Sequence, residues 1–204
     1  MPSRTRLKSS LFLLLMLFIA AATGCVNIKP VSTSYLHDYI QEHDDFWQFA
    51  GEQSGVRIRC FFSLSQDSNL YFFDADLYDA GIVPVFIEIE NIRLDSVRWT
   101  WPDVEIKTDQ WRLEPVAEGQ LREAVFKKYG IDSYTENDLE QFDNSFGELL
   151  MSEIDIGEGE KITGVIYFKG GRFHPGMMNS PMMIMGNVWI GDRKAKLVFR
   201  LNRL

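Results

Sequence analysis

Hydrophobic and polar residues alternate with a period of two over much of the chain beyond residue 55. In the clearest segment, residues 83–90, one face carries only valine and isoleucine, and the other carries Glu88 and Glu90. This alternation predicts a strand of an antiparallel sheet that buries one face and leaves the other largely in water. Similar patterns predict strands at residues 56–62, 70–73, 94–101, 104–107, 110–113, 162–168, 187–190 and 195–201.

Two segments have the spacing of helices instead. Between positions 36 and 47, apolar residues recur at helical intervals and acidic residues fill the opposite face. This predicts an amphipathic N-terminal helix over residues 35–51 that packs on the rest of the domain. The spacing of apolar residues over about 117–151 predicts a helical insertion with two helices, and Thr135 is the expected N-cap of the second.

Short strands separated by turn residues favour a β-sandwich. Strands and helices do not alternate regularly, which argues against a parallel α/β sheet. We therefore predict a mainly β fold, an antiparallel β-sandwich in a single domain over residues 35–204, with the N-terminal helix and the helical insertion attached to it.

The N-terminal segment has the parts of a secretory signal peptide. Arg4, Arg6 and Lys8 precede an apolar run of 12 residues at positions 11–22, and small residues follow it. A membrane-spanning helix needs about 20 apolar residues. The run is therefore expected to be removed with a signal peptide of residues 1–24.

The end of this segment, Ala22-Thr23-Gly24-Cys25, resembles the lipobox of bacterial lipoprotein precursors. The resemblance implies cleavage before Cys25, lipid on the cysteine sulfur, an acyl chain on its amine, and a lipidated tether over residues 25–34. Val26 is not aspartate, and by resemblance to the sorted lipoproteins of double-membrane bacteria this implies the outer membrane, facing the periplasm. The alternative is an ordinary secretory signal followed by a chance cysteine.

A second resemblance covers the body of the chain. The run 80–91 ends in Glu90-Asn91, and a Gly-Glu turn at 157–160 and a strand at 164–168 follow it. This order looks like that of immunoglobulin-like domains in bacterial envelope lipoproteins. The resemblance implies an immunoglobulin-like sandwich and brings no catalytic residues with it.

Charge narrows the range of partners. The signal segment holds three of the 21 Lys and Arg residues and none of the 29 Asp and Glu residues, so the mature chain of 180 residues carries a formal charge of −11. Such a chain repels phosphate backbones, and we find no basic run, so binding to nucleic acid is disfavoured. Attraction to anionic lipid is disfavoured for the same reason, which leaves the lipid chains to hold the membrane.

Methionine is concentrated between residues 177 and 185. Thioether sulfurs suit Cu(I), and a nearby imidazole would add to such a site, so the alternative function is a periplasmic copper or small-ligand binder. Soft, flexible side chains also fill irregular parts of a core or form a partner-facing patch, which is the competing interpretation. The candidate ligands are His174, Met177, Met178, Met182, Met183 and Met185.

Tryptophans form a second candidate site. Trp99, Trp101 and Trp111 lie close together in the sequence, and Trp99 and Trp101 share one face of a predicted strand. Rings exposed on a sheet could stack on sugars or on a partner. In a sandwich, however, tryptophans more often pack in the core.

With Cys25 lipidated, Cys60 stands alone, so no disulfide framework holds the fold. Cys60 shares a predicted strand face with Val56 and Ile58, which predicts a small buried residue. The alternative is a reactive thiol, for which the sequence offers no nearby histidine or basic helix terminus.

Motifs of enzyme chemistry are lacking in the sequence. His37 and His43 are six residues apart and do not share a helix face, as an i, i+4 metal pair would. The chain contains no Cys-x-x-Cys, no His-Glu-x-x-His and no Gly-x-Ser-x-Gly. We therefore expect a non-enzymatic envelope lipoprotein without a cofactor, a structural or interaction module whose partner is another envelope protein.

Overall fold

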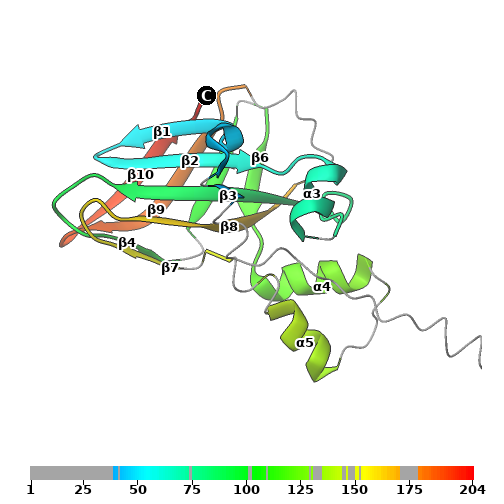
Figure 1. The fold of residues 1–204 in the computed structure, drawn as a ribbon. Coiled ribbons are helices and arrows are strands. Elements are labelled where there is room, and N and C mark those ends of the chain that lie inside the picture. Colours follow the sequence, from blue (N-terminus) through cyan, green and yellow to red (C-terminus); the bar gives the residue numbers. More distant parts are fainter. Residues whose placement is uncertain are drawn as a thin grey trace, which may run out of the picture.

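The structure is a computed structural model that describes residues 39–40, 42–73, 75–100, 103–108, 110–128, 130, 135–143, 146, 150–151, 153–170 and 179–204. Its strands form two layers, with the helices gathered at one end (Figure 1). The elements are η1 (Asp44–Phe46), β1 (Phe49–Gln53), β2 (Val56–Phe62), α3 (Gln66–Phe73), β3 (Ile82–Asn91), β4 (Val97–Thr100), β5 (Val104–Lys107), β6 (Arg112–Pro115), α4 (Glu118–Lys128), α5 (Glu136–Phe142), β7 (Glu153–Ile156), β8 (Lys161–Lys169), β9 (Met182–Ile190), β10 (Arg193–Arg200) and β11 (Asn202–Arg203).

The named strands pair in antiparallel fashion. The first sheet has the order β11-β1-β2-β3-β8-β6. In the second sheet, β9 pairs with β10 along one edge and with β5 and β4 along the other, and β7 lies outside β4. Strand β6 joins the two sheets, because Leu113 pairs with Ile106 of β5 and Pro115 pairs with Phe168 of β8.

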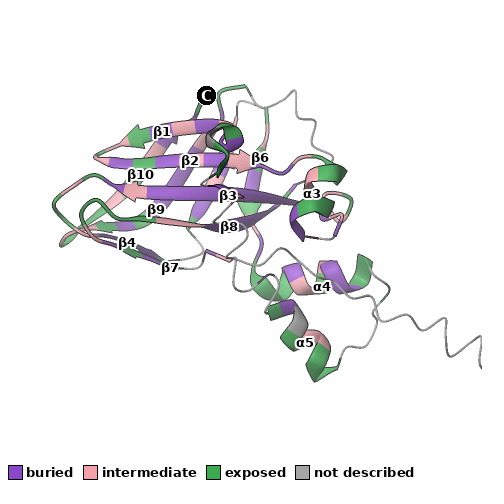
Figure 2. Cartoon of the chain, viewed as in Figure 1, coloured by how far each residue is buried: buried purple, intermediate pink, exposed green. Residues whose placement is uncertain are grey.

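Two hydrophobic cores lie on opposite faces of the first sheet. One fills the space between the sheets, and the other lies between the first sheet and the helices. Successive residues of a strand point to opposite faces, so β3 and β8 contribute to both. Ile87 and Phe168 belong to the first core, whereas Phe86 and Tyr167 belong to the second. Both strands are accordingly buried over most of their length (Figure 2).

The predicted immunoglobulin-like antiparallel sandwich is confirmed as a mainly β, sandwich-like fold. The helical insertion is present as α4 and α5, and helical turns also precede β1 at the N-terminal side. Thr135 is the N-cap of α5, as expected, and forms a reciprocal capping box with Asp138. These elements could be predicted from the sequence because the residues that specify them lie within or next to them.

The prediction that residues 83–90 leave one face in water is wrong. Every residue of β3 except Glu90 is buried, because β3 is a central strand and α3 covers its N-terminal half through Phe86. Glu88 is only 4% exposed. Its carboxylate is neutralised by Arg59 at 2.5 Å and Lys161 at 3.3 Å, on the two neighbouring strands.

The N-terminal helix predicted over residues 35–51 does not reach its expected end. The helical turns give way to β1 from Phe49 onward. Gly51, the expected helix terminator, lies inside β1, where a Cβ atom would come within 2.9 Å of the carbonyl oxygen of Arg200. The absence of a side chain therefore allows β1 to lie close against the end of β10.

The strand predicted at residues 70–73 is wrong as well, because these residues are the last turns of α3. Ser65 starts this helix: its hydroxyl accepts a hydrogen bond from the Ser68 amide at 3.1 Å, and its carbonyl accepts one from the Asn69 amide at 3.1 Å. The serine side chain thus satisfies a free amide of the first turn.

Residues 1–38 lie outside the described residues, and the predicted signal peptide, Cys25 and the lipidated tether lie there with them. None of the helices formed by the described residues is both long enough and apolar enough to cross a membrane.

Candidate functional site

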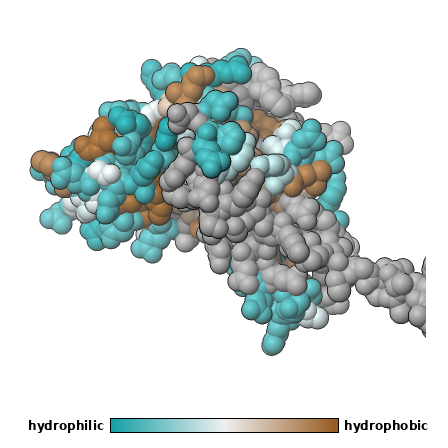
Figure 3. All heavy atoms as spheres, in the orientation of Figure 1, coloured by the Kyte–Doolittle hydropathy of each residue, from teal (hydrophilic) through white to brown (hydrophobic). Residues whose placement is uncertain are grey.

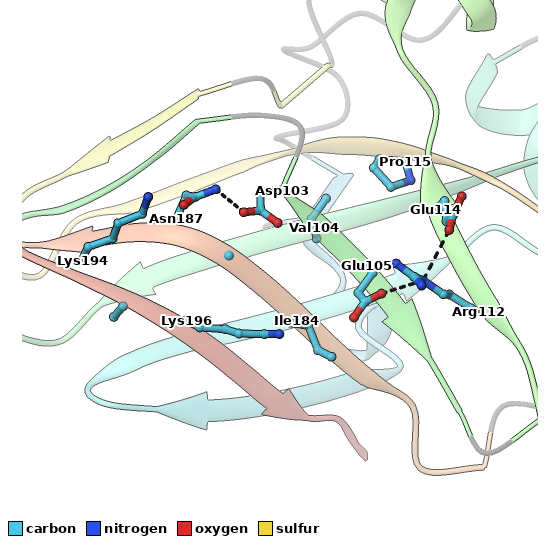
Figure 4. Close-up of a pocket in the computed structure, with 12 residues that line it drawn as sticks. Asp103, Val104, Glu105, Arg112, Glu114, Pro115, Ile184, Asn187, Lys194 and Lys196 are labelled. Atoms are coloured by element: carbon cyan, nitrogen blue, oxygen red, sulfur yellow. Dashed lines mark hydrogen bonds and ion pairs between the residues drawn. The ribbon is translucent and has the colours of Figure 1, made fainter.

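A polar groove of about 820 Å³ lies on the outer face of the second sheet, the face turned away from the core between the sheets (Figure 4). It crosses β6, β5, β9 and β10. Its lining residues are Asp103, Val104, Glu105, Arg112, Glu114, Pro115, Ile184, Gly186, Asn187, Lys194, Ala195 and Lys196.

The floor of the groove is shaped by a bulge in β9. Met185 pairs with Leu197 and Val188 pairs with Ala195, so β9 has one residue more than β10 over this interval. Asn187 takes up the extra residue with a positive φ of 52°, a conformation that asparagine adopts more readily than most residues. Because of the extra residue, Met185 and Val188 both face the core.

Asp103 holds this bulge from the neighbouring segment. Its carbonyl oxygen accepts a hydrogen bond from the Gly186 amide at 2.8 Å, and its carboxylate accepts one from the Asn187 side chain. The carboxylate occupies the space that a side chain at residue 186 would need. Glycine is therefore required there for Asp103 to reach the bulge.

The wall of the groove on β5 and β6 carries paired charges. Arg112 Nε lies 2.6 Å from the carboxylate of Glu105 and 3.4 Å from that of Glu114. The opposite wall, on β10, carries Lys194 and Lys196, which are exposed and form no ion pair with another described residue. Figure 4 shows the Lys196 side chain extending toward Ile184. The described residues of the lining include no serine, histidine or cysteine, and they offer charge and hydrogen-bonding groups for binding.

A second hollow, of about 610 Å³, lies between α4 and the turn that precedes β3. Its lining includes apolar residues such as Ile82 and Val116, with Lys127, Lys128 and Lys169 also present. Lys128 is ion-paired with Asp79.

Of the candidate copper ligands, Met182, Met183 and Met185 lie within the described residues. Met183 and Met185 are buried in the core between the sheets, at 0% and 2% exposure, so the core-filling interpretation is confirmed for these two. Met182 is half-buried at the start of β9. His174, Met177 and Met178 lie outside the described residues. Within the described residues, no group of three or more His, Cys, Asp or Glu is placed to hold a metal ion.

The candidate tryptophans do not form an exposed platform among the described residues. Trp99 is 1% exposed in the core between the sheets, and its ring nitrogen donates a hydrogen bond to the carbonyl of Asp103 at 3.3 Å. Trp111 is half-buried and packs against the same core. Trp101 lies outside the described residues. Trp189, at 42%, is exposed near the groove, and it is not among the candidate residues predicted from the sequence.

Cys60 and Tyr167 are titratable groups that solvent does not reach. Cys60 is fully buried, which confirms the interpretation as a small core residue, and burial raises the pKa of its thiol. Tyr167 is fully buried in the second core, and burial likewise raises the pKa of its hydroxyl. Neither group is poised for chemistry at the surface.

The basic wall of the groove was not predicted, although the sequence contains its signal. Lys194, Lys196 and Arg200 alternate with Leu197 and Phe199, which face the core. Alternation along a strand gathers charges on one face without a run of consecutive cations.

Comparisons with known proteins add little to this picture. No protein-family model matches the chain, and no curated protein matches it. Among solved structures, the crystal structure of the yjhA protein from Bacillus subtilis is similar at 13% identity and a TM-score of 0.31, over 59% of this chain and 75% of that one. The fold therefore rests on the strand pairing described above.

Proposed function

We propose that the protein is a lipid-anchored, non-enzymatic binding module of the bacterial cell envelope, which contacts another envelope protein through the outer face of its second sheet. The observation that carries the proposal is Cys25, placed directly after a signal-like segment that ends in Ala22-Thr23-Gly24. Lipid on this cysteine would hold an acidic domain at a bilayer that its own surface charge does not attract.

The length of chain between Cys25 and the first described residue is compatible with a tether from the membrane to the domain. Residues 26–38 separate Cys25 from the first described residue, and thirteen residues span at most about 45 Å. The groove, whose charged walls face away from both cores, supports the binding part of the proposal. By the resemblance of Cys25-Val26 to sorted lipoproteins, the anchor lies in the outer membrane and the domain faces the periplasm.

Metabolic labelling with an alkyne-bearing fatty acid tests the anchor. Cells that express the full chain should incorporate the label, and the Cys25→Ser precursor should not. Cys60→Ser is the matched control, because Cys60 is buried in the core, and it should keep the label. Label on the Cys25→Ser chain, or none on the wild type, would contradict the proposal.

A thiol count on the purified full-length protein gives an independent readout. Burial and the raised pKa of Cys60 should make the native protein unreactive toward a disulfide reagent. After unfolding in guanidinium, the lipidated chain should show one thiol, because the sulfur of Cys25 is held in a thioether. Two thiols per unfolded chain would mean that Cys25 carries no lipid, and Cys25→Ser calibrates the single-thiol signal.

A further inference from the structure

We infer that the outer face of the second sheet binds an acidic, extended segment of the partner protein. The residues assigned to this role are Trp189 and a basic strip, defined as Arg98, Lys194, Lys196 and Arg200. The inference rests on the proposed function, because it assumes that the outer face of the second sheet contacts a partner protein. It does not depend on the lipid at Cys25.

Three paired strands place Trp189 between two cations. Trp189 on β9 lies directly opposite Arg98 on β4 and Lys194 on β10. Paired strands are about 4.8 Å apart, so the three residues form a row about 10 Å wide. Trp189 is 42% exposed, whereas tryptophan is highly buried on average. Its ring is therefore available to a partner that also meets the two cations.

Strand β10 continues the positive charge along its own length. Lys196 and Arg200 point to the same face as Lys194, because Leu197 and Phe199 point into the core. Same-face neighbours on a strand are about 6.6 Å apart, which gives the strip a length of about 20 Å. An extended peptide with an acidic residue at every second position presents carboxylates about 6.6 Å apart, which matches the interval between Lys194 and Lys196. The half-buried Val198 occupies the position on the same face between Lys196 and Arg200.

The charge of the strip is not neutralised within the described residues. All four cations are exposed, and none forms an ion pair with another described residue. Arg112 on the same face differs, because it is held by Glu105 at 2.6 Å. Asp155 on β7 lies opposite Arg98, so the excess of charge is greatest along β10. In a chain with a formal charge of −8, this strip is where an acidic partner meets a favourable local potential.

Apolar contacts beside the strip favour a protein segment as the occupant. Ile184 is 6% exposed on this outer face and belongs to neither core. It forms one cross-strand row with Glu105 of β5 and the half-buried Val198 of β10. A peptide can supply a carboxylate or an aliphatic side chain at each position that faces the sheet, so it can meet the cations and the half-buried Val198 beside them together.

A fluorescence titration tests the inference. The probe is a synthetic peptide of alternating Glu and Val, added to the detergent-solubilised full-length protein, and Trp189→Phe identifies the share of the signal that comes from Trp189. The peptide should bind in low salt and dissociate as salt rises. Lys194→Glu with Lys196→Glu should weaken binding by about tenfold, since two ion pairs become repulsive contacts.

Arg122→Glu with Lys127→Glu on α4 is the matched control. It makes the same change in net charge away from the strip and should alter the affinity by less than about twofold. Circular dichroism checks that both double variants are folded. The Cys25→Ser protein should bind the peptide like the wild type, so a failure of the anchor and a failure of the strip are distinguishable.

The inference is overturned if the peptide does not bind, or if a peptide of alternating Lys and Val binds as well. Binding of phosphatidylglycerol vesicles without binding of the peptide would identify a lipid surface as the occupant instead. Strip-dependent self-association in light scattering would identify a second copy of the chain. An equal loss in the control double variant would show that net charge, rather than the strip, governs the binding.

Discussion

Asn91 holds two turns of the sandwich together. Its buried side-chain nitrogen lies 2.8 Å from the carbonyl oxygen of Asp95, 3.2 Å from that of Ile156 and 3.0 Å from that of Gly157. The backbone carbonyl of Asn91 accepts a hydrogen bond from the Gly159 amide at 2.7 Å. Asp95 belongs to the turn after β3, Ile156 is the last residue of β7, and Gly157 and Gly159 belong to the turn between β7 and β8. Both turns carry the chain from one sheet to the other, so one side chain fixes both crossings.

Asn91→Ala should lower the free energy of unfolding by about 2 to 4 kcal/mol, because buried carbonyl groups lose their donor. Urea denaturation measures the change. Asn179→Ala is the control, since Asn179 is exposed outside any strand, and it should cost less than about 0.5 kcal/mol. A decrease of less than about 1 kcal/mol in the free energy of unfolding of Asn91→Ala would contradict this prediction. It would mean that water forms the hydrogen bonds that the Asn91 amide makes in the wild type.

At the scale of single residues, predictions succeed where the cause is local. The burial of Cys60 follows from its place in an alternating strand, and the cap at Thr135 follows from the residues beside it. The burial of Glu88 was missed, because it depends on Arg59 and Lys161 on two other strands. Likewise, the sequence contains both Asn91 and the Gly-Glu turn at 157–160, but no pattern in it indicates that they are in contact.

Predictions of whole elements also failed where pairing with other segments of the chain decides the secondary structure. Strand β1 was missed because the spacing of its residues is also helical, and its strand pairing depends on β2 and β11. Residues 70–73 were predicted as a strand like the alternating segments around them, although they are continuously apolar and Ser65 upstream carries the helix signal. Half of β9 was missed because its bulge at Asn187 breaks the alternation that identifies a strand.

Helix α5 offers a test of element stability through its cap. The Thr135 amide donates a hydrogen bond to the Asp138 carboxylate at 2.7 Å, and this bond, followed by the bond from the Thr135 hydroxyl, holds the pKa of Asp138 below its ordinary value of 3.8. A carboxylate with a lowered folded-state pKa adds stability above its ordinary pKa and loses it as pH falls through the folded value.

Asp138→Asn should therefore destabilise α5 at neutral pH. The difference from the wild type should shrink as the pH falls below 3.8, and it should vanish below the lowered folded-state pKa of Asp138, where both side chains are neutral. Hydrogen exchange of α5, compared with the wild type at each pH, measures this. Glu140→Gln in the same helix is the control and should show no such dependence. A difference that persists unchanged in acid would assign the effect to the shape of the side chain rather than to its charge.

At the scale of the whole molecule, charge and burial are properties of the sheets rather than of sequence segments. The chain has a formal charge of −8, yet the outer face of the second sheet gathers the basic strip. The first sheet was expected to have a wet face, yet it carries the helices and a second core there. The sandwich and the insertion could be predicted separately. Their packing on one sheet could not, because no local pattern encodes which face an insertion covers.

The shared strands also decide how the molecule unfolds. Because β3 and β8 supply alternate residues to the two cores, neither core can be lost without removing support from the other. Unfolding in urea should therefore be a single transition, with far-ultraviolet ellipticity and tryptophan fluorescence changing together. Ile87→Val in the first core should cost about 1 kcal/mol and shift both signals equally, and Val165→Ala in the second core should also shift both. If Val165→Ala lowers the midpoint of the ellipticity alone, the helices form a separate unit on the sandwich.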